Sequence, residues 1–172
     1  MTSRFSDIQK DVSAFMDAAG QTVRLTPQNI PGDEIDLRIR LITEEYDETL
    51  DALLHLADPG IPPGGTLGWL AEFADGVADL VYVLVGTTLA MGIDMNEVWS
   101  EVQRANMQKI TGPIRPDGKR LKPEGWTPPN IEGVLHVQRR EHEESATSRA
   151  AESQGQVRGQ TTLEEVRGWN CP

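Results

Sequence analysis

Apolar residues near the amino terminus recur at the spacing of a helix. The apolar positions that fall every three or four residues are Ile8, Val12, Phe15 and Met16. This spacing predicts a first helix with one apolar face. Ser6 is a suitable N-cap for it, and Gly20 is a suitable end. Residues 21–33 contain Pro27, Pro31 and Gly32, so they are predicted to form a connection.

The second predicted helix opens at Asp33 and Glu34, which favour the positive N-terminal end of a helix, and ends near Leu56. One stripe along it is apolar throughout and comprises Ile35, Ile39, Ile42, Tyr46, Leu50 and Leu53. A second stripe begins apolar and turns acidic in mid-helix, and comprises Leu37, Leu41, Glu44, Glu45, Glu48 and Ala52. Carboxylates therefore occupy positions where helical periodicity would place apolar residues.

A third helix is predicted from about residue 70 to residue 91, after a loop over residues 58–68 that is rich in proline and glycine. Glu72, Asp75 and Asp79 share one face of it, at spacings of three and four residues. Residues 80–85 are apolar around the whole circumference, which is typical of a buried helix. Asp79 is therefore expected at the mouth of a buried segment.

The rest of the chain predicts a fourth helix and a polar carboxy-terminal region. Residues 94–97 have the spacing of a capping box with Asp94 as the cap, and the helix is expected to end near Lys109. Its expected inward residues are Val98, Val102, Ala105 and Ile110. Residues 111–130 are predicted as a loop, and Asn130 as the cap of a short polar helix that ends near Arg139. Beyond about residue 141 the chain resembles a polar tail, with a small docking helix over residues 163–169.

No internal repeat and no convincing strand is found, so the predicted fold is all-α with four main helices. A domain over residues 1–135 and a polar C-terminal extension over residues 136–172 are expected. The formal net charge of −11 argues against a general nucleic-acid binder, which would be basic. The single cysteine, Cys171, cannot form an intrachain disulfide, and no long apolar span or signal segment is found. A soluble, intracellular protein that contacts no membrane is expected.

The two acidic stretches predict a metal site. Unpaired carboxylates are costly to bury and repel each other on adjacent turns, so a cation is expected between the helices. Histidine and cysteine are absent from both stretches, and ligation by oxygen alone indicates Mg²⁺ or Mn²⁺. The alternative is a pair of solvated acidic faces. The candidate metal ligands are Glu44, Glu45, Glu48, Glu72, Asp75 and Asp79.

Basic residues after the third helix are candidates for contacts with phosphate. Asn106 and Lys109 share a helix face and suit a grip on phosphate oxygens, although a basic helix end is also favoured by the helix dipole. Lys119, Arg120 and Lys122 form a basic loop that either covers a polyanionic substrate or is simply solvated. Trp126 stacks on a base or packs on its own domain. The candidate substrate-binding residues are Arg104, Asn106, Lys109, Lys122 and Trp126.

The motif Glu44-Glu45-x-x-Glu48, followed by Glu72-x-x-Asp75, resembles the EExxE…ExxD signature of the all-α nucleoside triphosphate pyrophosphohydrolases, the MazG superfamily. The resemblance covers about residues 5–135 and is closest to the single-domain phage and bacterial branch. Many members place the aspartate of ExxD directly before the buried run. In that register Asp79 is the aspartate, and Gly76 stands where the glutamate is expected. The further segments that carry the resemblance are 15–21, 78–83, 91–94, 104–109 and 117–129.

The resemblance implies a four-helix MazG-like fold and Mg²⁺-dependent hydrolysis of a nucleoside triphosphate to the monophosphate and diphosphate, with Mn²⁺ as a substitute. Glu45 or Glu48 is the expected proton acceptor. It also implies a homodimer or a dimer of dimers with the site near the subunit interface. Trp69 and Phe73 are then candidates for the base pocket or the interface.

Three functions follow from this resemblance. The first is hydrolysis of a purine nucleoside triphosphate such as dGTP or GTP, in control of the nucleotide pool of a bacterial or phage-infected cytoplasm. The second is phosphoribosyl-ATP pyrophosphohydrolase activity. The third is a non-catalytic helical bundle that binds nucleotides, which the missing acid at Gly76 favours.

Overall fold

The computed structural model describes residues 4–62 and 65–167 of the chain. In chain order the elements are α1 (Arg4–Ala18), α2 (Gly32–Leu56), α3 (Thr66–Ala90), α4 (Met95–Gln108), the short 3-10 helix η1 (Lys109–Thr111) and α5 (Ile131–Arg167). Within the described residues the one β feature is an isolated bridge between Ile114 and Arg120. The predicted all-α fold is confirmed.

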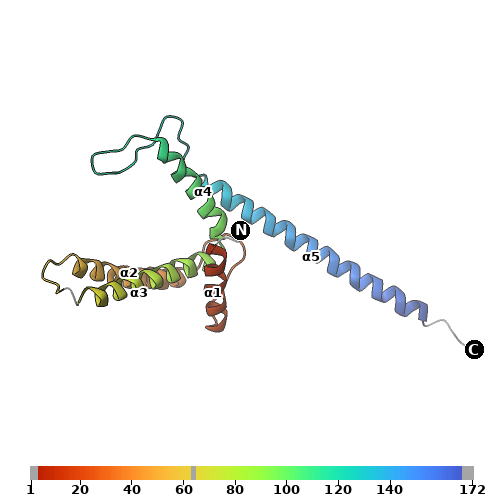
Figure 1. The fold of residues 1–172 in the computed structure, drawn as a ribbon. Coiled ribbons are helices and arrows are strands. Elements are labelled where there is room, and N and C mark those ends of the chain that lie inside the picture. The colour runs from red at the N-terminus through yellow and green to blue at the C-terminus, as the bar shows by residue number, and fades with distance from the viewer. Residues whose placement is uncertain (1–3, 63–64, 168–172) are drawn as a thin grey trace, which may run out of the picture.

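The helices form a hairpin with branches at one end (Figure 1). α2 and α3 run side by side along their length, and α1 lies across the end of the pair where α3 leads to α4. α4 packs mainly on α1 and α5. α5 then extends away from the other helices as a long projecting rod (Figure 1). The α2–α3 hairpin is therefore the part of the chain that brings the two acidic stretches together.

Gly76 sets the close approach of α3 to α2. A Cβ atom built on Gly76 would lie 2.8 Å from Thr49 Oγ1 and 3.2 Å from Thr49 Cα, so a larger residue would meet the backbone of α2. Thr49 is itself buried, and its hydroxyl donates to the Glu45 carbonyl at 2.7 Å. The missing side chain at Gly76 thus allows the two acidic helices to touch backbone to backbone at mid-length.

The apolar core lies where α1 meets the far ends of α2 and α3. Val12 and Met16 of α1 are almost fully buried and pack with Val85 and Ala90 of α3. The loop before α2 is held to the end of α3, because the Arg24 amide donates to the Leu89 carbonyl and the Arg24 guanidinium to the Ala90 carbonyl. This core fixes the angle of α1 and leaves the middle of the hairpin open.

The apolar stripe of α2 is not buried within one chain. Ile39 and Tyr46 are more than half exposed, and Leu50 and Leu53 are also exposed. The buried positions of α2 are Ala52, on the second stripe, and Arg38 and Thr49, which lie between the two stripes. The expectation of full burial for residues 80–85 is likewise wrong, because Val85 is buried but Leu84 is 44% exposed. A hairpin that packs on one neighbour at one end has too little protein around it to cover every apolar face.

Several predicted helix boundaries need correction. α3 begins at Thr66, four residues before the predicted start, because Gly68 lies within its first turn rather than breaking it. α1 begins at Arg4 rather than after Ser6, and Ile110 is 49% exposed rather than inward. Glycine in a first turn costs little, because the first amides of a helix have no intrahelical acceptor to lose.

Polar contacts at the ends of α4 and α5 differ from the predicted capping box. Asp94 caps α4 by accepting from the Asn96 amide at 2.8 Å, but its own amide donates to Gln138 Oε1 of α5 rather than to Glu97. Asn130 caps α5 as predicted, by accepting from the Gly133 amide at 3.0 Å. α5 is thereby tied to the start of α4.

α5 continues well beyond the predicted end at Arg139 and includes most of the segment expected to be a polar tail. Residues 141–167 lack proline and are rich in alanine, glutamate, glutamine and arginine, which favour helix without needing a buried face. The predicted docking helix over residues 163–169 falls partly within α5, and its last residues lie outside the described part of the chain. The predicted domain boundary after residue 135 falls inside α5.

α3 has the length and apolar composition of a membrane span, with a mean hydropathy of 1.4 in its most apolar window. The same composition is found in core helices of soluble proteins, and α3 packs along α2 with Gly76, Val85, Gly86 and Ala90 buried. Its acid residues also face α2. One helix of this kind is weak evidence for a membrane span, and α3 is the helix of the hairpin that carries Glu72, Asp75 and Asp79.

Candidate functional site

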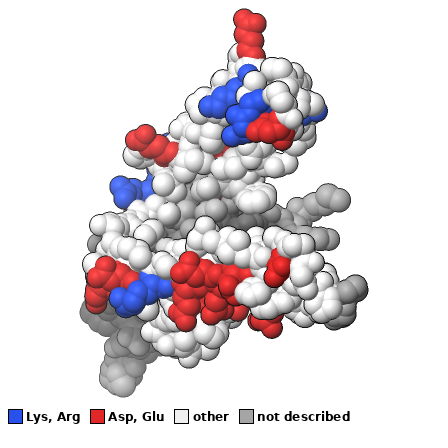
Figure 2. All heavy atoms as spheres, turned by 90° about the vertical axis from the view of Figure 1, so that its left-hand side faces the viewer, with Lys and Arg blue, Asp and Glu red and all other residues white. Residues whose placement is uncertain are grey.

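The acidic face of the hairpin is formed by Glu44, Glu45 and Glu48 of α2 together with Glu72, Asp75 and Asp79 of α3. The Thr49–Gly76 contact lies at its centre and draws the two groups of carboxylates together. Figure 2 shows a large group of acidic side chains on the lower part of the view. The juxtaposition of the two acidic stretches that the sequence predicted is therefore present in the fold.

Two cavities border the contact between α2 and α3. The first, of about 500 Å³, brings Glu48 of α2 opposite Glu72 and Asp75 of α3. The second, of about 480 Å³, brings Glu45 opposite Asp79. Both registers of the ExxD motif thus face a glutamate of α2, one in each cavity. Glu44 lies on an exposed part of α2 and lines neither cavity.

The first cavity also contains residues that the sequence analysis did not select. Asp47 and Asp51 of α2 line it beside Glu48, and Asp51 follows Glu48 by three residues, a spacing that could have identified it. Trp69 lines the same cavity, and its indole stacks on the His55 ring with centroids 3.8 Å apart. Of the two aromatic candidates, Trp69 therefore lies within the acidic site.

The pKa of Glu45 is affected by the other carboxylates of the acidic face. Partial desolvation raises the pKa of Glu45, and the negative charges of Asp79, Glu48, Glu44 and Asp75 raise it further, in that order. Carboxylates from both helices thus act on one group. Such mutual repulsion is the electrostatic setting in which a bound cation is most favoured.

The donor set fits a hard divalent cation by its chemistry. The acidic face offers oxygen ligands, which Mg²⁺ prefers. Within the described part of the chain, no three carboxylates already converge on one point as metal ligands. Exposed acidic side chains change rotamer within nanoseconds, so a metal would draw them together by rotation about their own bonds.

Gly76 occupies the glutamate position of the ExxD motif when Asp79 is taken as its aspartate. In the register that makes Asp79 the aspartate, a glutamate would be expected at this position, yet a side chain there would clash with Thr49. The missing acid is explained by the packing of α2 against α3.

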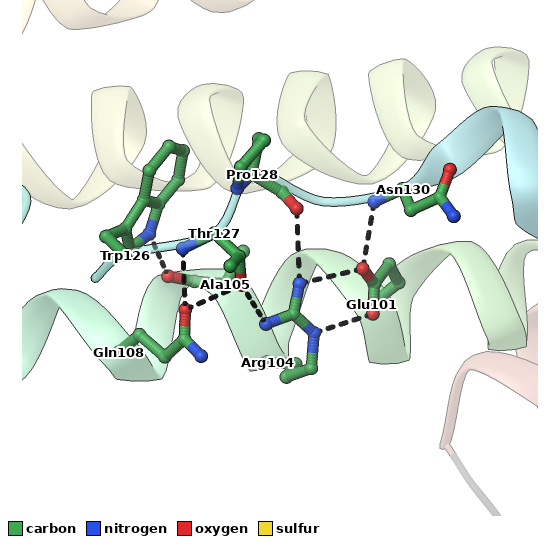
Figure 3. Close-up of polar contacts among 8 residues, drawn as sticks. All are labelled: Glu101, Arg104, Ala105, Gln108, Trp126, Thr127, Pro128 and Asn130. Carbon is green, nitrogen blue, oxygen red and sulfur yellow. Dashed lines mark hydrogen bonds and ion pairs between the residues drawn. The ribbon is translucent and has the colours of Figure 1, made fainter.

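The predicted phosphate-binding residues Arg104 and Trp126 make contacts within their own part of the chain (Figure 3). Arg104 forms a double hydrogen bond with Glu101 at 2.8 Å and also donates to Thr127 and to the Pro128 carbonyl. The Trp126 indole N–H donates to the Ala105 carbonyl at 2.8 Å. These bonds fasten the loop before α5 to α4.

The remaining basic candidates gather around the same tryptophan. The Lys122 ammonium lies 4.1 Å from the Trp126 ring centroid, and the Lys109 ammonium lies 5.6 Å from it. Lys109 also donates to Asn106 Oδ1 at 2.8 Å. In Figure 2 a group of basic side chains occupies the upper part of the view, apart from the acidic group. α4 and the loop after it lie apart from the middle of the α2–α3 hairpin (Figure 1), so a single chain does not bring these elements to the acidic face.

Arg38 is a buried charged residue that the sequence analysis did not select. It is 7% exposed and lines the second cavity with Glu45 and Asp79. Burial lowers its pKa, and the charge of Glu34 partly restores it. Its position seven residues before Glu45, two turns away on the same face of α2, is a signal that could have identified it.

A comparison with protein families identifies a matching family. The phosphoribosyl-ATP pyrophosphohydrolase family matches residues 12–106, more than half of the chain. The matched region contains the acidic face, Arg38, Arg104 and Asn106, and it ends before Lys109, Lys122 and Trp126. A search of curated proteins gave no significant match. The chain therefore belongs to the phosphoribosyl-ATP pyrophosphohydrolase family, part of the MazG-like superfamily of all-α nucleoside triphosphate pyrophosphohydrolases.

Proposed function

We propose that the chain is a Mg²⁺-dependent pyrophosphohydrolase that cleaves a nucleoside triphosphate into the monophosphate and diphosphate. The family supports a pyrophosphohydrolase-type activity. The observation that carries the proposal is the close packing of α2 on α3 at Gly76 and Thr49, which brings carboxylates of both helices to two adjoining cavities. Mn²⁺ would substitute for Mg²⁺ at oxygen ligands.

Each carboxylate has a proposed role. Glu48, Glu72 and Asp75 would hold metal on the side of the first cavity, and Glu45 and Asp79 on the side of the second, with Glu44 completing the set. The metal would supply a water of lowered pKa and positive charge beside the phosphates. Glu45 and Glu48 are the two candidates to accept a proton from that water.

The proposed substrate is a purine nucleoside triphosphate such as dGTP or GTP. A role in control of the nucleotide pool, in a bacterial or phage-infected cytoplasm, goes with this choice. A domain of this enzyme family points to a soluble, cytoplasmic protein. The second candidate is phosphoribosyl-ATP, which the description of the matching family favours. The two candidates share the same bond cleavage and differ in the nucleotide.

The proposed assembly is a homodimer or a dimer of dimers. The exposed stripe of α2, with Ile39, Tyr46, Leu50 and Leu53, supports it, because a contiguous apolar face of this kind is usually covered. A second copy packed on the hairpin would also give the basic residues of α4 and its loop a route to an acidic face that they do not reach within their own chain.

The test of the proposed function is a diphosphate-release assay with all common ribo- and deoxyribonucleoside triphosphates and with phosphoribosyl-ATP. It is run with Mg²⁺, with Mn²⁺ and with a chelator. We expect diphosphate and monophosphate in equal amounts, with metal only. Release of inorganic phosphate alone, or no product from any nucleotide, would rule the proposal out.

A further inference from the structure

The chain contains two aspartate–glycine pairs, and the structure gives them very different surroundings. They are Asp75–Gly76, in the middle of α3, and Asp117–Gly118, in the loop between η1 and α5. A glycine after an aspartate has no Cβ atom beside its amide nitrogen, so this nitrogen can approach the carboxyl carbon of the aspartate. Their reaction closes a five-membered succinimide ring, which opens to isoaspartate. The proposed hydrolysis does not involve this chemistry.

The pair in α3 is held in helical geometry. Gly76 is buried, and a Cβ atom built on it would lie 2.8 Å from Thr49 Oγ1. Within an α-helix each amide N–H donates to the carbonyl four residues earlier, so the amide of Gly76 is already engaged. The backbone at Asp75 cannot rotate without unwinding α3 against α2. The ring therefore cannot close there while the chain is folded.

The pair at residues 117 and 118 lies at the tip of an exposed turn. Its residue order is that favoured in a type I turn, with Pro116 second and Gly118 fourth, and the Gly118 amide donates to the Arg115 carbonyl at 2.8 Å. Gly118 has φ at +84°, and a Cβ atom built on it would meet nothing within 4 Å. Residues 113–120 are all exposed. The Gly118 nitrogen is therefore held by a hydrogen bond of a surface turn and not by a packed helix.

Arg115 restrains the other reacting group, the carboxyl of Asp117. Its Nε atom donates to Asp117 Oδ1 at 2.9 Å, and its Nη2 atom donates to Oδ2. The Lys119 amide donates to the same Oδ1 at 3.2 Å. These bonds, with those from Arg115 first, lower the pKa of Asp117 and keep its carboxyl ionised. A carboxylate held in this way is a poor target for the glycine nitrogen, because ring closure proceeds from the protonated carboxyl and expels water.

We propose that Asp117 is the site at which the folded chain converts to isoaspartate on ageing, and that Arg115 slows this conversion. The Gly118 nitrogen forms a bond to Asp117 Cγ, and one carboxyl oxygen leaves as water with the carboxyl proton and the amide proton. Water then adds to one of the two ring carbonyls. Addition at Cγ breaks the new bond and restores aspartate, whereas addition at the backbone carbonyl breaks the original peptide bond and gives isoaspartate. The overall change is an isomerisation, and water is its only reagent.

The isomerisation disrupts the pairing on either side of the turn. The main chain of isoaspartate runs through Cβ and Cγ, so the turn becomes longer by one carbon atom. The Arg115 amide donates to the Lys119 carbonyl at 2.8 Å, and Ile114 and Arg120 form the isolated bridge. Both contacts depend on the length of the turn. The modification therefore displaces the loop that carries the basic residues Lys119, Arg120 and Lys122.

The test follows isoaspartate in the full folded chain, kept with a chelator at physiological temperature and pH for several weeks. Enzymatic methylation of the isoaspartyl carboxyl measures its amount, and peptide mapping gives its position and detects the succinimide by the loss of one water. In wild type, isoaspartate should form slowly at residue 117 and not at residue 75. Arg115→Gln should raise the rate at residue 117 about 2- to 5-fold, because an exposed ion pair restrains its partners only weakly. Arg115→Lys keeps the charge without the paired bonds, so its rate should lie between the two.

The matched control is Arg140→Gln, which removes an exposed arginine from an ion pair with Glu144 on α5 and should age as wild type does. Asp117→Glu keeps a carboxylate near Arg115 and should abolish the signal at residue 117, because its longer side chain closes the ring far more slowly. Isoaspartate that appears first at residue 75, or a rate in Arg115→Gln equal to that of wild type, would overturn the proposal. None of these readouts depends on turnover, so the outcome is independent of the proposed hydrolysis.

Discussion

The contact between Gly76 and Thr49 makes a quantitative prediction about Gly76→Ala. The added Cβ atom would lie 2.8 Å from Thr49 Oγ1, 3.2 Å from Thr49 Cα and 3.3 Å from Thr49 N. The hydroxyl can rotate away, but the backbone atoms cannot, so α2 and α3 must move apart. Overpacking of this kind costs about 1–3 kcal/mol, whereas the higher helix propensity of alanine returns about 1 kcal/mol. We expect a net loss of about 1 kcal/mol, or about 2–4 °C in Tm for a chain of this size.

The matched control is Gly68→Ala, in the same helix. A Cβ atom there meets nothing within 4 Å, so only the propensity gain applies and the variant should be at least as stable as wild type. Urea or thermal unfolding in the presence of a chelator measures both variants. Adding Thr49→Ala to Gly76→Ala should recover part of the loss, because it removes the hydroxyl at 2.8 Å. Equal stability of Gly76→Ala and Gly68→Ala would refute the close packing of α2 on α3.

Three further predictions concern charge. The pKa of Glu45 is raised in the folded chain, so protonated Glu45 favours folding at low pH. This contribution to stability is lost as pH rises through the folded pKa. Glu45→Gln should therefore raise the metal-free Tm at pH 7 and make Tm less dependent on pH across the pKa of Glu45. Asp79→Asn should lower turnover at least ~100-fold while the protein stays folded, and near-normal turnover together with losses in Glu72→Gln and Asp75→Asn would assign the metal to the first cavity alone. Arg104 lowers the pKa of Glu101 to about 2, so the stability that Glu101 provides is present above its usual value of 4.5 and is lost as pH falls toward 2; hydrogen exchange of the Asn130 amide, its other partner, should increase over that range and should not do so in Glu101→Gln.

The sequence predicted the main helices because their apolar periodicity is strong and their ends carry clear signals. Asp94 and Asn130 cap helices as expected. The pairing of the two acidic stretches was also predicted, since each lies in mid-helix on either side of a short connection. The Gly20 turn was found for the same local reason, with φ at +68°.

Features that depend on contacts between side chains of different helices were not predicted. The sequence shows Gly76 as a missing acid, and only the position of Thr49 across the helix pair shows it as a packing contact. Arg38 resembles any arginine on a charged helix until α1 and α3 close around it. Burial of residues 80–85 was overestimated. A helix that is apolar on all sides is expected to be covered, but its sequence does not show whether its own chain or another chain covers it.

The roles of Arg104 and Trp126 depend on context in the same way. Arg104 lies within α4 and Trp126 in the loop before α5, and at either place a basic or aromatic residue suits phosphate binding or local packing. The structure shows the bonds that hold the loop to α4, and contact with a substrate stays a prediction for all the basic candidates. Lys122, whose ammonium lies over the Trp126 ring, is the residue whose substitution most simply separates phosphate binding from local packing.

The most direct test of the central claim measures diphosphate release from dGTP as a function of Mg²⁺ concentration, for wild type, Glu45→Gln and the distant acid variant Glu132→Gln. Glu132 is an exposed acid in the first turn of α5 and serves as the control. If the carboxylates of α2 and α3 form the metal-dependent site, wild type and Glu132→Gln should show the same saturable dependence on Mg²⁺, and Glu45→Gln should lose turnover. Release of diphosphate that is independent of metal, or that Glu45→Gln leaves unchanged, would contradict the assignment.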